Sequence, residues 1–435
     1  MAAPGLILAA PASGSGKTVV TLALLRALRR AGVRVASAKA GPDYIDPAFH
    51  AAATGRDCVN LDAWGMRPAT LYGLVVEISR DVDLVLCEGV MGLFDGASGG
   101  GGSTADLAAL TGWPVLLVVD AKGQGVSVAA LAEGFARHRA DIDVAGIVCN
   151  RVGGPGHERI LREALAGSPP LLGCLPATPA LALPSRHLGL VQASEHDALE
   201  TFLDSAAALV AGRLDLARLR AIARPARLPD APVPCTIPPL GQRVAVAQDA
   251  AFRFCYPALL RGWRDAGASI LPFSPLADEA PDPSADAVYL PGGYPELHAG
   301  RLAANARFLG GLRRAAGSGA AVFGECGGYM VLVDGLVDAD GTRHAMAGLL
   351  PATTSFAARK LHLGYRRIVT RRPSPLGGPG TAFTGHEFHY ASLCGDISGD
   401  ALFDVRDSRG DALPPAGQAR GNIAGSFIHL IDSAP

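Results

Sequence analysis

The first half of the chain alternates between two patterns of apolar and polar residues. Short runs rich in Val, Ile and Leu predict strands at 5–9, 33–38, 82–87, 115–120, 144–149 and 171–175. Segments of helical spacing lie between these runs and predict helices at 17–30, 68–79, 104–110, 126–137 and 158–166. Alternation of this kind is typical of an open, mostly parallel sheet that is wound on both faces by helices.

The second half of the chain resumes this alternation after a break. A helical pattern rich in Ala, Leu and Arg covers 195–223, and the Pro-rich segment after it has no periodicity. A second series then predicts strands at 243–248, 269–273, 287–290 and 320–323, with a helix at 252–266. We therefore expect an α/β fold with two doubly wound domains, at 1–225 and 242–435, joined by a linker at 226–241.

The composition agrees with sheets that are buried on both faces. Hydrophobic residues make up 49% of the 435 residues, and charged residues make up 18%. The charged share is below the ~25% of an average soluble domain, as expected when helices cover both faces of a sheet. The low charge also predicts an apolar interface, and hence a homodimer.

Charge and segment length argue against several classes of protein. The formal net charge is −1 and there is no basic block, so we expect no nucleic-acid partner. No apolar run approaches the ~20 residues that span a bilayer, so we expect no membrane partner. The apolar start lacks a preceding basic region, which favours a buried first strand and a cytoplasmic protein. The eight cysteines contain no Cys-x-x-Cys spacing, so neither a disulfide framework nor a thiolate zinc site is expected.

A glycine-rich loop joins the first predicted strand to the first predicted helix. Its backbone N–H groups can converge on phosphate oxygens, and the helix N-terminus adds positive potential. Lys17 suits the β and γ phosphates, and the Thr18 hydroxyl suits Mg²⁺. The usual pattern has glycine where this chain has Pro11, so the loop is a variant. We expect ATP to bind at Ser13, Gly14, Ser15, Gly16, Lys17 and Thr18.

Two acidic loops follow predicted strands, at the edge where parallel sheets gather their ligands. The first loop, 39–47, carries Asp43 and Asp46, and the second, 88–96, begins with Glu88. Carboxylates beside a triphosphate are natural Mg²⁺ ligands or substrate-positioning groups. Either loop alone would be interpreted as a turn, but two such loops beside a phosphate loop favour a function. Asn150 follows the fifth strand, where its amide could recognise adenine or simply form a turn.

A cysteine flanked by glycines, Cys326, lies between an apolar strand and an apolar helical run. A nucleophile on a sharp strand-to-helix turn needs small neighbours, and the helix N-terminus is expected to lower the thiol pKa. Gly292 and Gly293 follow another predicted strand and are expected to form an oxyanion site with the Gly327 amide. His429 offers a general base near the C-terminus. Together these residues predict Cys–His acyl chemistry.

A further polar cluster, 386–390, contains two histidines and a glutamate. Metal binding there is conceivable, but no third ligand is identifiable. Substrate contact or a buried polar network is the favoured interpretation.

These motifs, in this order, resemble those of the cobyrinic acid and hydrogenobyrinic acid a,c-diamide synthase family. The resemblance rests on the loops 10–18, 39–47 and 88–96, on Gly-Glu-Cys-Gly-Gly at 324–328 and on the distal histidine. It covers nearly the whole chain. The N-terminal half is similar to the P-loop fold of dethiobiotin synthetase. The C-terminal half is similar to a flavodoxin-like class I glutamine amidotransferase domain of the cobyrinic subfamily.

The resemblance implies a ligase of cobalamin biosynthesis that takes its nitrogen from glutamine. Cys326, activated by His429, would release ammonia from glutamine, and the ammonia would move internally to the synthetase site. There ATP and Mg²⁺ would phosphorylate the c and then the a acetate of a corrinoid, and ammonia would displace phosphate. By position in the motifs, the implied Mg²⁺ ligands are Thr18, Asp46 and Glu88. The residues associated with substrate are Asp43, Tyr44, Asp46 and Asp95.

The chain departs from the usual class I triad at one position. A glutamate normally stands two residues after the histidine, and here that position is Ile431. The cobyrinic subfamily lacks this glutamate, so the departure agrees with the assignment but leaves open what orients His429. Asp432 would face another direction in an extended segment. We expect slow glutaminase activity until the synthetase site is loaded.

Three other functions stay open. Cobyric acid synthase has the same domain pair, although the 88–96 loop fits the a,c enzyme better. A nickel-sirohydrochlorin a,c-diamide synthase is a second relative. A partitioning-type P-loop ATPase switch belongs to a different class, and the second domain argues against it. We expect hydrogenobyrinate rather than cobyrinate as substrate, although no identified side chain recognises the metal.

Overall fold

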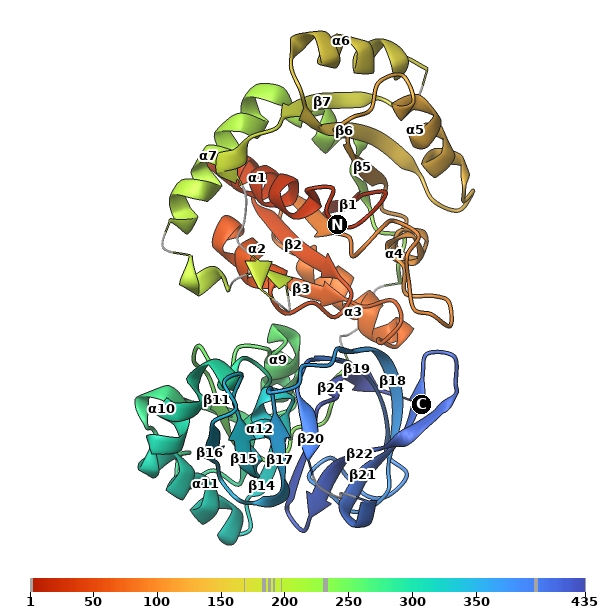
Figure 1. Ribbon diagram of the computed structural model, residues 1–435. Helices are drawn as coiled ribbons and strands as arrows, with labels where there is room; N and C mark the ends of the chain where they lie inside the picture. The colour runs from red at the N-terminus through yellow and green to blue at the C-terminus, as the bar shows by residue number, and fades with distance from the viewer. Residues whose placement is uncertain are drawn as a thin grey trace. The chain divides into compact units, whose positions relative to one another are not determined.

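The computed structural model describes residues 3–167, 169–181, 185–186, 189–190, 192–196, 198–229, 234–394 and 398–434. The chain forms two compact units (Figure 1). The first unit comprises Met1–Trp64, Pro68–Ala97 and Gly101–Val233. The second unit comprises Gly65–Arg67, Ser98–Gly100 and Pro234–Pro435. Each unit is therefore largely a continuous half of the chain, and the second adds two short segments from the first half.

The first unit is built on a sheet with the strand order β3-β2-β4-β1-β5-β6-β7, in which all neighbours are parallel. Its strands are β1 (Pro4–Ala9), β2 (Val35–Ala40), β3 (Val59–Leu61), β4 (Leu84–Glu88), β5 (Val115–Asp120), β6 (Val144–Val152) and β7 (Leu171–Pro176). A short strand, β10 (Arg224–Pro225), pairs with β1 in the antiparallel sense. Every residue of β2, β3 and β4 is buried, which explains why they contain few polar residues.

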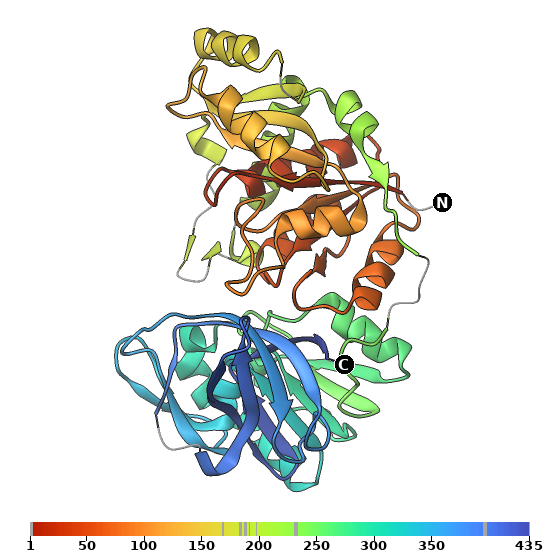
Figure 2. The same cartoon turned by 90° about the vertical axis from the view of Figure 1, so that its right-hand side faces the viewer.

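Helices connect these strands, and Figure 2 shows the sheet of this unit among them. They are α1 (Lys17–Arg30), α2 (Asp46–Thr54), α3 (Pro68–Ile78), α4 (Thr104–Thr111), α5 (Val128–Arg137), α6 (Pro155–Ala164), α7 (Leu199–Arg213) and α8 (Leu216–Ile222). Short elements are η1 (Pro179–Leu181), η2 (Ala193–Glu195), β8 (Ser185–Arg186) and β9 (Gly189–Leu190). Helix α1 packs against both α2 and α7. Among the described residues, no helix is long and apolar enough to cross a membrane.

Two features of the first unit differ from the sequence-based expectation. The helical pattern at 195–223 is divided into α7 and α8, because Leu214 has an extended backbone and bridges to Gly173 of β7. The Asp215 side chain then caps α8 by accepting from the Arg218 amide. The second feature is α2, which begins at Asp46 inside the segment that was interpreted as a loop.

The second unit combines a parallel half with an antiparallel half in one sheet, of order β12-β11-β13-β14-β23-β22-β21-β18-β19-β24. The strands from β12 to β23 in this order are parallel, and the remaining pairs are antiparallel. The bounds are β11 (Arg243–Ala247), β12 (Ser269–Phe273), β13 (Ala287–Leu290), β14 (Ala321–Glu325), β18 (His362–Thr370), β19 (Ala382–His389), β21 (Ala401–Asp407), β22 (Ala412–Arg420), β23 (Ile423–Ser426) and β24 (His429–Ser433).

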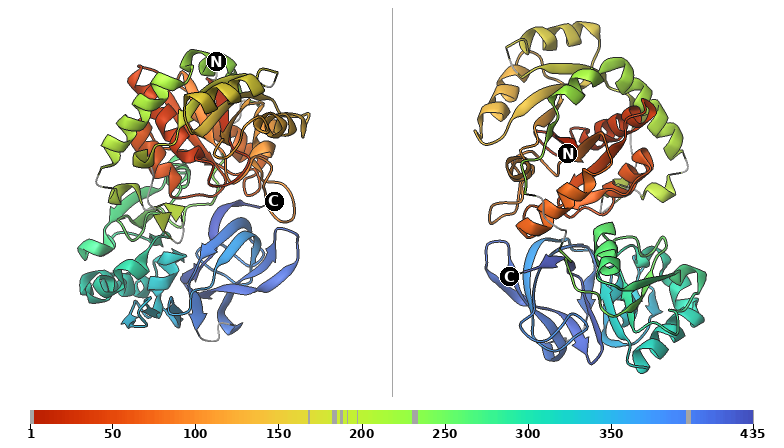
Figure 3. Two further views of the ribbon diagram at one scale, coloured as in Figure 1. Left: turned by 45° about the horizontal axis from the view of Figure 1, so that its top comes forward. Right: turned by 180° about the vertical axis from the view of Figure 1, so that it is seen from behind.

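The remaining elements of the second unit flank this sheet. A smaller sheet contains β15 (Val333–Val337), β16 (Arg343–Ala345), β17 (Leu350–Ser355) and β20 (Ser392–Cys394). The helices are α9 (Pro257–Asp265), α10 (Ala299–Ala304), α11 (Ala306–Gly317), α12 (Gly327–Leu332), η3 (Pro275–Ala277), η4 (Pro295–His298) and η5 (Ser398–Asp400). Both views of Figure 3 show the antiparallel strands, in blue, on one side of this unit and the helices, in green, on the other. Of the parallel half, β11, β12, β13 and β14 were predicted from the sequence, whereas β23 and the antiparallel half were not.

Candidate functional site

The glycine-rich loop between β1 and α1 has the geometry of a phosphate-binding loop. Gly14 and Gly16 have φ of 80° and 86°, in the left-handed region that favours glycine. A side chain at Gly16 would place its Cβ 2.2 Å from Asn150 Nδ2, so a larger residue there would have to displace the Asn150 amide. Lys17 opens α1, and its Nζ donates to the Met91 carbonyl at 3.0 Å. Burial lowers the pKa of the Lys17 ammonium.

Glu88, at the end of β4, is the centre of a buried polar cluster beside this loop. Its Oε1 accepts from Thr18 Oγ1 at 2.6 Å and from Lys39 Nζ at 2.9 Å. Its Oε2 lies 2.7 Å from His50 Nε2. Lys39 also donates to Asp46 Oδ2 at 2.5 Å, so its ammonium bridges two carboxylates. The structure thus brings together all three predicted Mg²⁺ ligands, with two cationic neighbours that the sequence did not single out.

The side chains of this cluster hold one another in their charged forms. Despite burial, Asp46 and Glu88 hold the pKa of Lys39 well above its usual value. Burial opposes the charge of His50, but Cys58 and Glu88 raise its pKa to about 10. Burial also opposes the Glu88 carboxylate, and Lys39 and His50 nevertheless hold its pKa below the usual range. Burial raises the pKa of Asp46 to about 6. The two cations, Lys39 and His50, are thus balanced within the cluster by the carboxylates of Glu88 and Asp46.

The other predicted substrate residues lie on the two acidic loops. Asp43 Oδ1 accepts from the backbone amides of Ile45 and Asp46, at 2.7 and 3.1 Å, and so shapes the entry into α2. Tyr44 is half-buried in the same turn. Asp95 is exposed, and its carboxylate accepts from the Gly92 amide at 2.9 Å. A Cβ at Gly92 would lie 2.7 Å from the Pro11 carbonyl oxygen, which places this loop against the phosphate loop.

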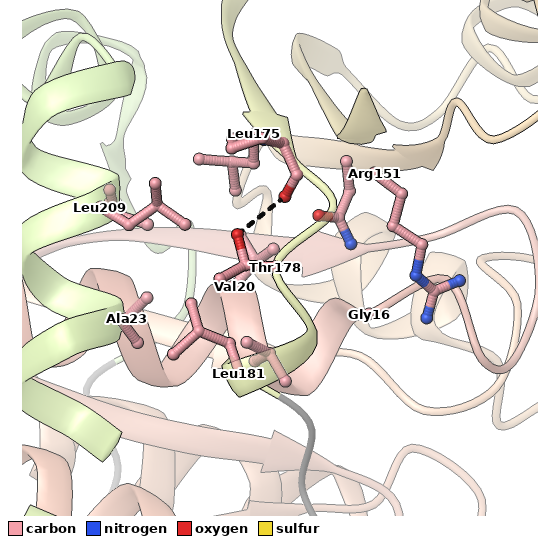
Figure 4. A pocket seen from close by; sticks show the side chains of 13 residues that line it. Gly16, Val20, Ala23, Arg151, Leu175, Thr178, Leu181 and Leu209 are labelled. Carbon is pink, nitrogen blue, oxygen red and sulfur yellow. Dashed lines mark hydrogen bonds between the residues drawn. The ribbon is translucent and has the colours of Figure 1, made fainter. Parts of the chain in front are cut away.

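A pocket lined largely by apolar side chains opens beside the phosphate loop, and its space, including the part open to solvent, is about 500 Å³ (Figure 4). Asn150 lines it, and Asn150 Nδ2 donates to the Ser15 carbonyl at 2.9 Å. Arg151 follows at the rim with its guanidinium on Asp120 at 2.6 Å. The remaining lining comes from α1, β7, the segment after β7 and α7: Gly16, Val19, Val20, Ala23, Leu175, Pro176, Thr178, Leu181, Ala206, Leu209 and Val210. A flat aromatic base attached to a phosphate chain matches this combination of apolar walls and one amide.

Cys326 lies on a strained turn between β14 and α12. Its backbone has φ of 46° and ψ of −105°, outside the regions that a cysteine usually adopts. The neighbours must be small: a Cβ at Gly328 would lie 1.9 Å from the Leu290 carbonyl oxygen, and one at Gly324 would lie 2.7 Å from the Gly328 backbone. The Cys326 amide donates to the Ser426 carbonyl at 2.7 Å, which ties the turn to β23.

The glycines predicted for an oxyanion site lie next to this turn. A Cβ at Gly327 would lie 3.0 Å from the Gly293 amide nitrogen, so these two residues are neighbours in space. A Cβ at Gly292 would lie 2.4 Å from His429 Cε1, so the imidazole packs directly on this glycine. The ring of His386 stacks on the His429 ring at 5.0 Å between centroids. All five predicted residues of the cysteine site are therefore gathered by β13, β14, α12 and β24.

Burial favours the neutral forms of both the thiol and the imidazole. Burial, together with the Glu296 carboxylate, raises the pKa of Cys326, and the Gly327 amide opposes this only in part. Burial, together with His386 and His389, lowers the pKa of His429 well below its usual value. The amide at the N-terminus of α12 thus lowers the thiol pKa as expected, but burial of the cysteine, which is 4% exposed, outweighs it, so the net shift is opposite to the expectation.

The cluster at 386–390 is a buried network of rings. His389 stacks on His362 and on Phe427, with centroid separations of 4.7 and 4.1 Å. Glu387 is bound by Arg366 at 2.6 Å. Within the described part of the chain, no group of three or more His, Cys, Asp or Glu side chains is placed to hold a metal ion. The stacked rings and the Arg366–Glu387 pair form a buried polar network, which was one of the two favoured interpretations, and substrate contact stays a prediction.

Three residues that the motifs did not single out belong to these sites: Lys39, His50 and Glu325. Lys39 could have been found from the sequence, because it is the first residue of the first acidic loop and directly follows a predicted strand. No sequence pattern pointed to His50, because this residue lies on helix α2, which was not predicted. Glu325 directly precedes the cysteine. A charged residue in a buried turn needs a hydrogen-bonding or charged partner, so its position there is a sign of function.

Comparison with known proteins defines the class to which the chain belongs. Residues 6–191 match the family model described as CobQ/CobB/MinD/ParA nucleotide binding domain. Residues 243–434 match the model described as CobB/CobQ-like glutamine amidotransferase domain. The chain is thus a nucleotide-binding domain followed by a glutamine amidotransferase domain.

Full-length relatives narrow this class to one family. Hydrogenobyrinate a,c-diamide synthase of Rhizobium meliloti (strain 1021) is 56% identical over 98% of this chain and 99% of that protein. The Sinorhizobium sp. protein of the same name is 56% identical over 99% of both chains. That of Rhodobacter capsulatus is 52% identical over 98% of both chains. The chain belongs to the hydrogenobyrinate a,c-diamide synthase family, whose members are glutamine-hydrolysing amidotransferases of cobalamin biosynthesis.

Proposed function

We propose that the protein uses ATP and glutamine to amidate the a and c acetate carboxylates of hydrogenobyrinate, as a cytoplasmic homodimer. The observation that carries the proposal is the presence of two complementary sites in one chain. One is a phosphate loop beside the Lys39–Glu88–Asp46 cluster, and the other is a strained cysteine beside an imidazole and two glycines. Phosphate activation of a carboxylate and release of ammonia from an amide are the two reactions that such sites support. The names of the full-length relatives supply the substrate.

The first site would activate the carboxylate. The loop amides and Lys17 would hold the phosphates of ATP, and the pocket lined by Asn150 would hold the adenine. A substrate carboxylate oxygen then attacks the γ phosphorus, ADP leaves, and an acyl phosphate forms. Ammonia attacks the acyl carbon and phosphate leaves. Lys39 is placed to neutralise the charge that builds up on the phosphoryl oxygens.

The residues at this site fit Mg²⁺. The donors are the Thr18 hydroxyl and the carboxylates of Asp46 and Glu88, and Mg²⁺ prefers oxygen ligands of this kind together with phosphates. When bound, the ion would screen the negative charge of the triphosphate. Asp43, Tyr44 and Asp95 lie on the flanking loops, and we propose that they position the substrate.

The second site would release ammonia from glutamine. Cys326 Sγ attacks the carboxamide carbon while His429 takes the thiol proton. The Gly293 and Gly327 amides would stabilise the oxyanion, and His429 returns the proton to the departing ammonia. Water then hydrolyses the glutamyl thioester. Because burial favours the neutral forms of the thiol and the imidazole, each cycle begins with a proton transfer that bound glutamine must favour.

Mass spectrometry of the products tests this function. Hydrogenobyrinic acid and cobyrinic acid are each incubated with protein, ATP, Mg²⁺ and glutamine. Two added amides and no more are expected, with hydrogenobyrinic acid as the better substrate. Four added amides on an a,c-diamide substrate would point to a cobyric acid synthase. Consumption of ATP and glutamine without amidation of either ring would support the two proposed reactions but exclude these corrinoids as the substrate.

Replacing the amide in the adenine pocket should weaken the choice of nucleotide. Asn150→Ala is expected to raise KM for ATP roughly 10-fold and to reduce the preference for ATP over GTP, because one hydrogen bond to a base contributes about 1–1.5 kcal/mol. Steady-state kinetics with both nucleotides would measure the ratio.

Ser15→Ala is the matched control for the shape of the loop. It removes the Ser15 Oγ bond to the Ala12 carbonyl, which is 2.8 Å long, and leaves the Asn150 amide in place. It should affect ATP and GTP equally. An unchanged ATP preference in Asn150→Ala would show that Asn150 only supports the loop.

A further inference from the structure

The position that carries the orienting glutamate in class I triads is apolar in this chain. Ile431 is buried, and a Cβ at Gly65 of the same unit would lie 2.7 Å from Ile431 Cδ1. Asp432, the next residue, is bound to Arg67 of the same unit. It accepts from the Arg67 amide and Nη2, both at 2.8 Å, and from Nε at 3.0 Å. Ile431 has no group that can accept the imidazole proton, and the Asp432 carboxylate is held by Arg67.

A carboxylate from the cysteine turn, that of Glu325, lies close to His429. Glu325 is the last residue of β14 and directly precedes the cysteine. It pairs in register with Ser426 of β23, three residues before His429. Its side chain is 3% exposed, and its Oε2 lies 3.9 Å from His429 Nδ1. The Tyr289 hydroxyl donates to the same oxygen at 2.8 Å, and the Leu430 amide donates to Oε1 at 3.2 Å.

We propose that Glu325 is the positioning residue of the glutaminase site and replaces the missing third member of the triad. Its carboxylate accepts the Nδ1 proton of His429, which leaves Nε2 as the nitrogen that takes the thiol proton. It also stabilises the imidazolium that forms when Cys326 attacks glutamine. This inference rests on the proposed glutaminase function of Cys326 and His429.

Two other contacts of the imidazole fix its plane. His386 stacks on the ring with an interplanar angle of 21°, and Gly292 lies against Cε1. Packing of this kind holds the orientation of a ring but does not choose between its two tautomers. A carboxylate at Nδ1 does choose, because it can only accept a proton.

The separation of 3.9 Å is longer than a hydrogen bond and describes a site at rest. Catalytic hydrogen bonds often tighten only when substrate is bound. A shift of the Glu325 carboxylate toward Nδ1 would close the contact while Tyr289 and Leu430 hold its two oxygens. The open contact agrees with slow glutamine hydrolysis in the absence of the other substrates.

The groups around Glu325 make its ionisation depend on pH near neutrality. Burial raises the pKa of Glu325 to about 7, against the hydrogen bonds from Tyr289 and the Leu430 amide. Burial and the Glu325 carboxylate itself hold the pKa of Tyr289 well above its usual value, so this phenol remains a donor. The other titratable neighbours are the thiols of Cys255 and Cys326, and the imidazoles of His386 and His389 face His429.

Glu325→Gln is the informative substitution. It preserves the shape of the side chain but replaces the proton acceptor that faces His429 Nδ1 with a proton donor. The Leu430 amide would hold the glutamine oxygen, so the NH₂ group would face His429 Nδ1. That NH₂ group donates, which places the ring proton on Nε2, where it blocks transfer from the thiol. The kcat for glutamine-dependent amidation should fall by about 100-fold or more, while KM for glutamine changes little.

The experiment compares nitrogen sources and pH profiles in the full chain. Wild type, Glu325→Gln, Glu325→Asp and the exposed control Glu279→Gln are assayed on hydrogenobyrinate with glutamine and with ammonium. We expect ammonium-dependent amidation to be unchanged in all four. The wild-type glutamine profile should rise with pH through an apparent pKa near that of Glu325, about 7. This rise of the glutamine-dependent rate with pH should be absent in Glu325→Gln. It should be partly restored in Glu325→Asp, which keeps a carboxylate.

Each outcome decides the proposal. Unchanged glutamine use in Glu325→Gln, with ammonium use intact, would overturn it. If Glu325→Gln amidates with neither glutamine nor ammonium, the pH profile of Glu325→Asp decides. A glutamine-dependent rate that still rises with pH supports the proposal, and the absence of this rise overturns it. Failure of the proposed function itself gives a different result, because wild type would then amidate hydrogenobyrinate with neither nitrogen source. Release of glutamate from glutamine would still report on Glu325 in that case.

Discussion

Cys326→Ala should abolish amidation with glutamine and preserve amidation with ammonium. We expect the glutamine-dependent rate to fall by about four orders of magnitude or more, because no other group can form the thioester. Ammonia bypasses the cysteine and needs only the acyl phosphate. The ammonium-dependent rate should increase as pH rises, because deprotonation supplies the nucleophilic form. Initial rates with each nitrogen source, followed by mass spectrometry of the diamide, would measure both effects.

The exposed cysteine Cys394 provides the matched control for this prediction. Cys394→Ala removes a thiol from the same unit without changing the turn at β14, so both nitrogen sources should be used normally. Full glutamine-dependent amidation by Cys326→Ala would show that Cys326 is not the nucleophile.

Lys17→Ala should remove amidation with both nitrogen sources. The lysine opens α1 beside Glu88, and its charge is expected to stabilise the phosphoryl group during transfer. Loss of such a preorganised charge costs roughly 10²- to 10³-fold in kcat. Phosphorylation precedes the use of ammonia from either source, so neither can rescue the variant. The rates of ADP release and diamide formation should fall together.

Glutamate release separates this defect from unfolding. Lys17→Ala leaves the cysteine site intact, so its basal glutaminase activity should equal that of wild type. Lys360→Ala, an exposed lysine of the second unit, should leave every activity unchanged. Ammonium-dependent amidation at the wild-type rate in Lys17→Ala would contradict the assignment of the phosphate loop.

The sequence predicts those parts of the fold whose burial is uniform. Strands such as β4 and β5 are continuous apolar runs, and α1 begins and ends at the predicted residues. The antiparallel half of the second unit escapes prediction because its strands have no clear alternation. Only two of the nine residues of β18 are buried, for example. Inside such a strand, pairs such as Arg366 with Glu387 satisfy polar groups that a sequence pattern assigns to solvent.

The sites divide in the same way between local and distant interactions. The phosphate loop and the cysteine turn are each encoded by a few adjacent residues, so their positions follow from the motif. The Lys39–Glu88 contact depends on strand order: the two residues pair in register because β2 lies beside β4, although β3 separates them in sequence. Similarly, Glu325 reaches His429 only because β23 pairs with β14. No spacing in the chain encodes these pairings.

The position of β1 in its sheet has a consequence for synthesis on the ribosome. This strand precedes all of its partners in the chain, and it pairs with residues 85–88, 115–117 and 224–225. Contacts across such long stretches of chain form slowly, because the intervening segment must first be closed into a loop. An apolar strand that waits for its partners is exposed to aggregation while translation continues. The rate at which the first half is translated, and the chaperones that meet it, should therefore influence how much protein folds, before either site can act.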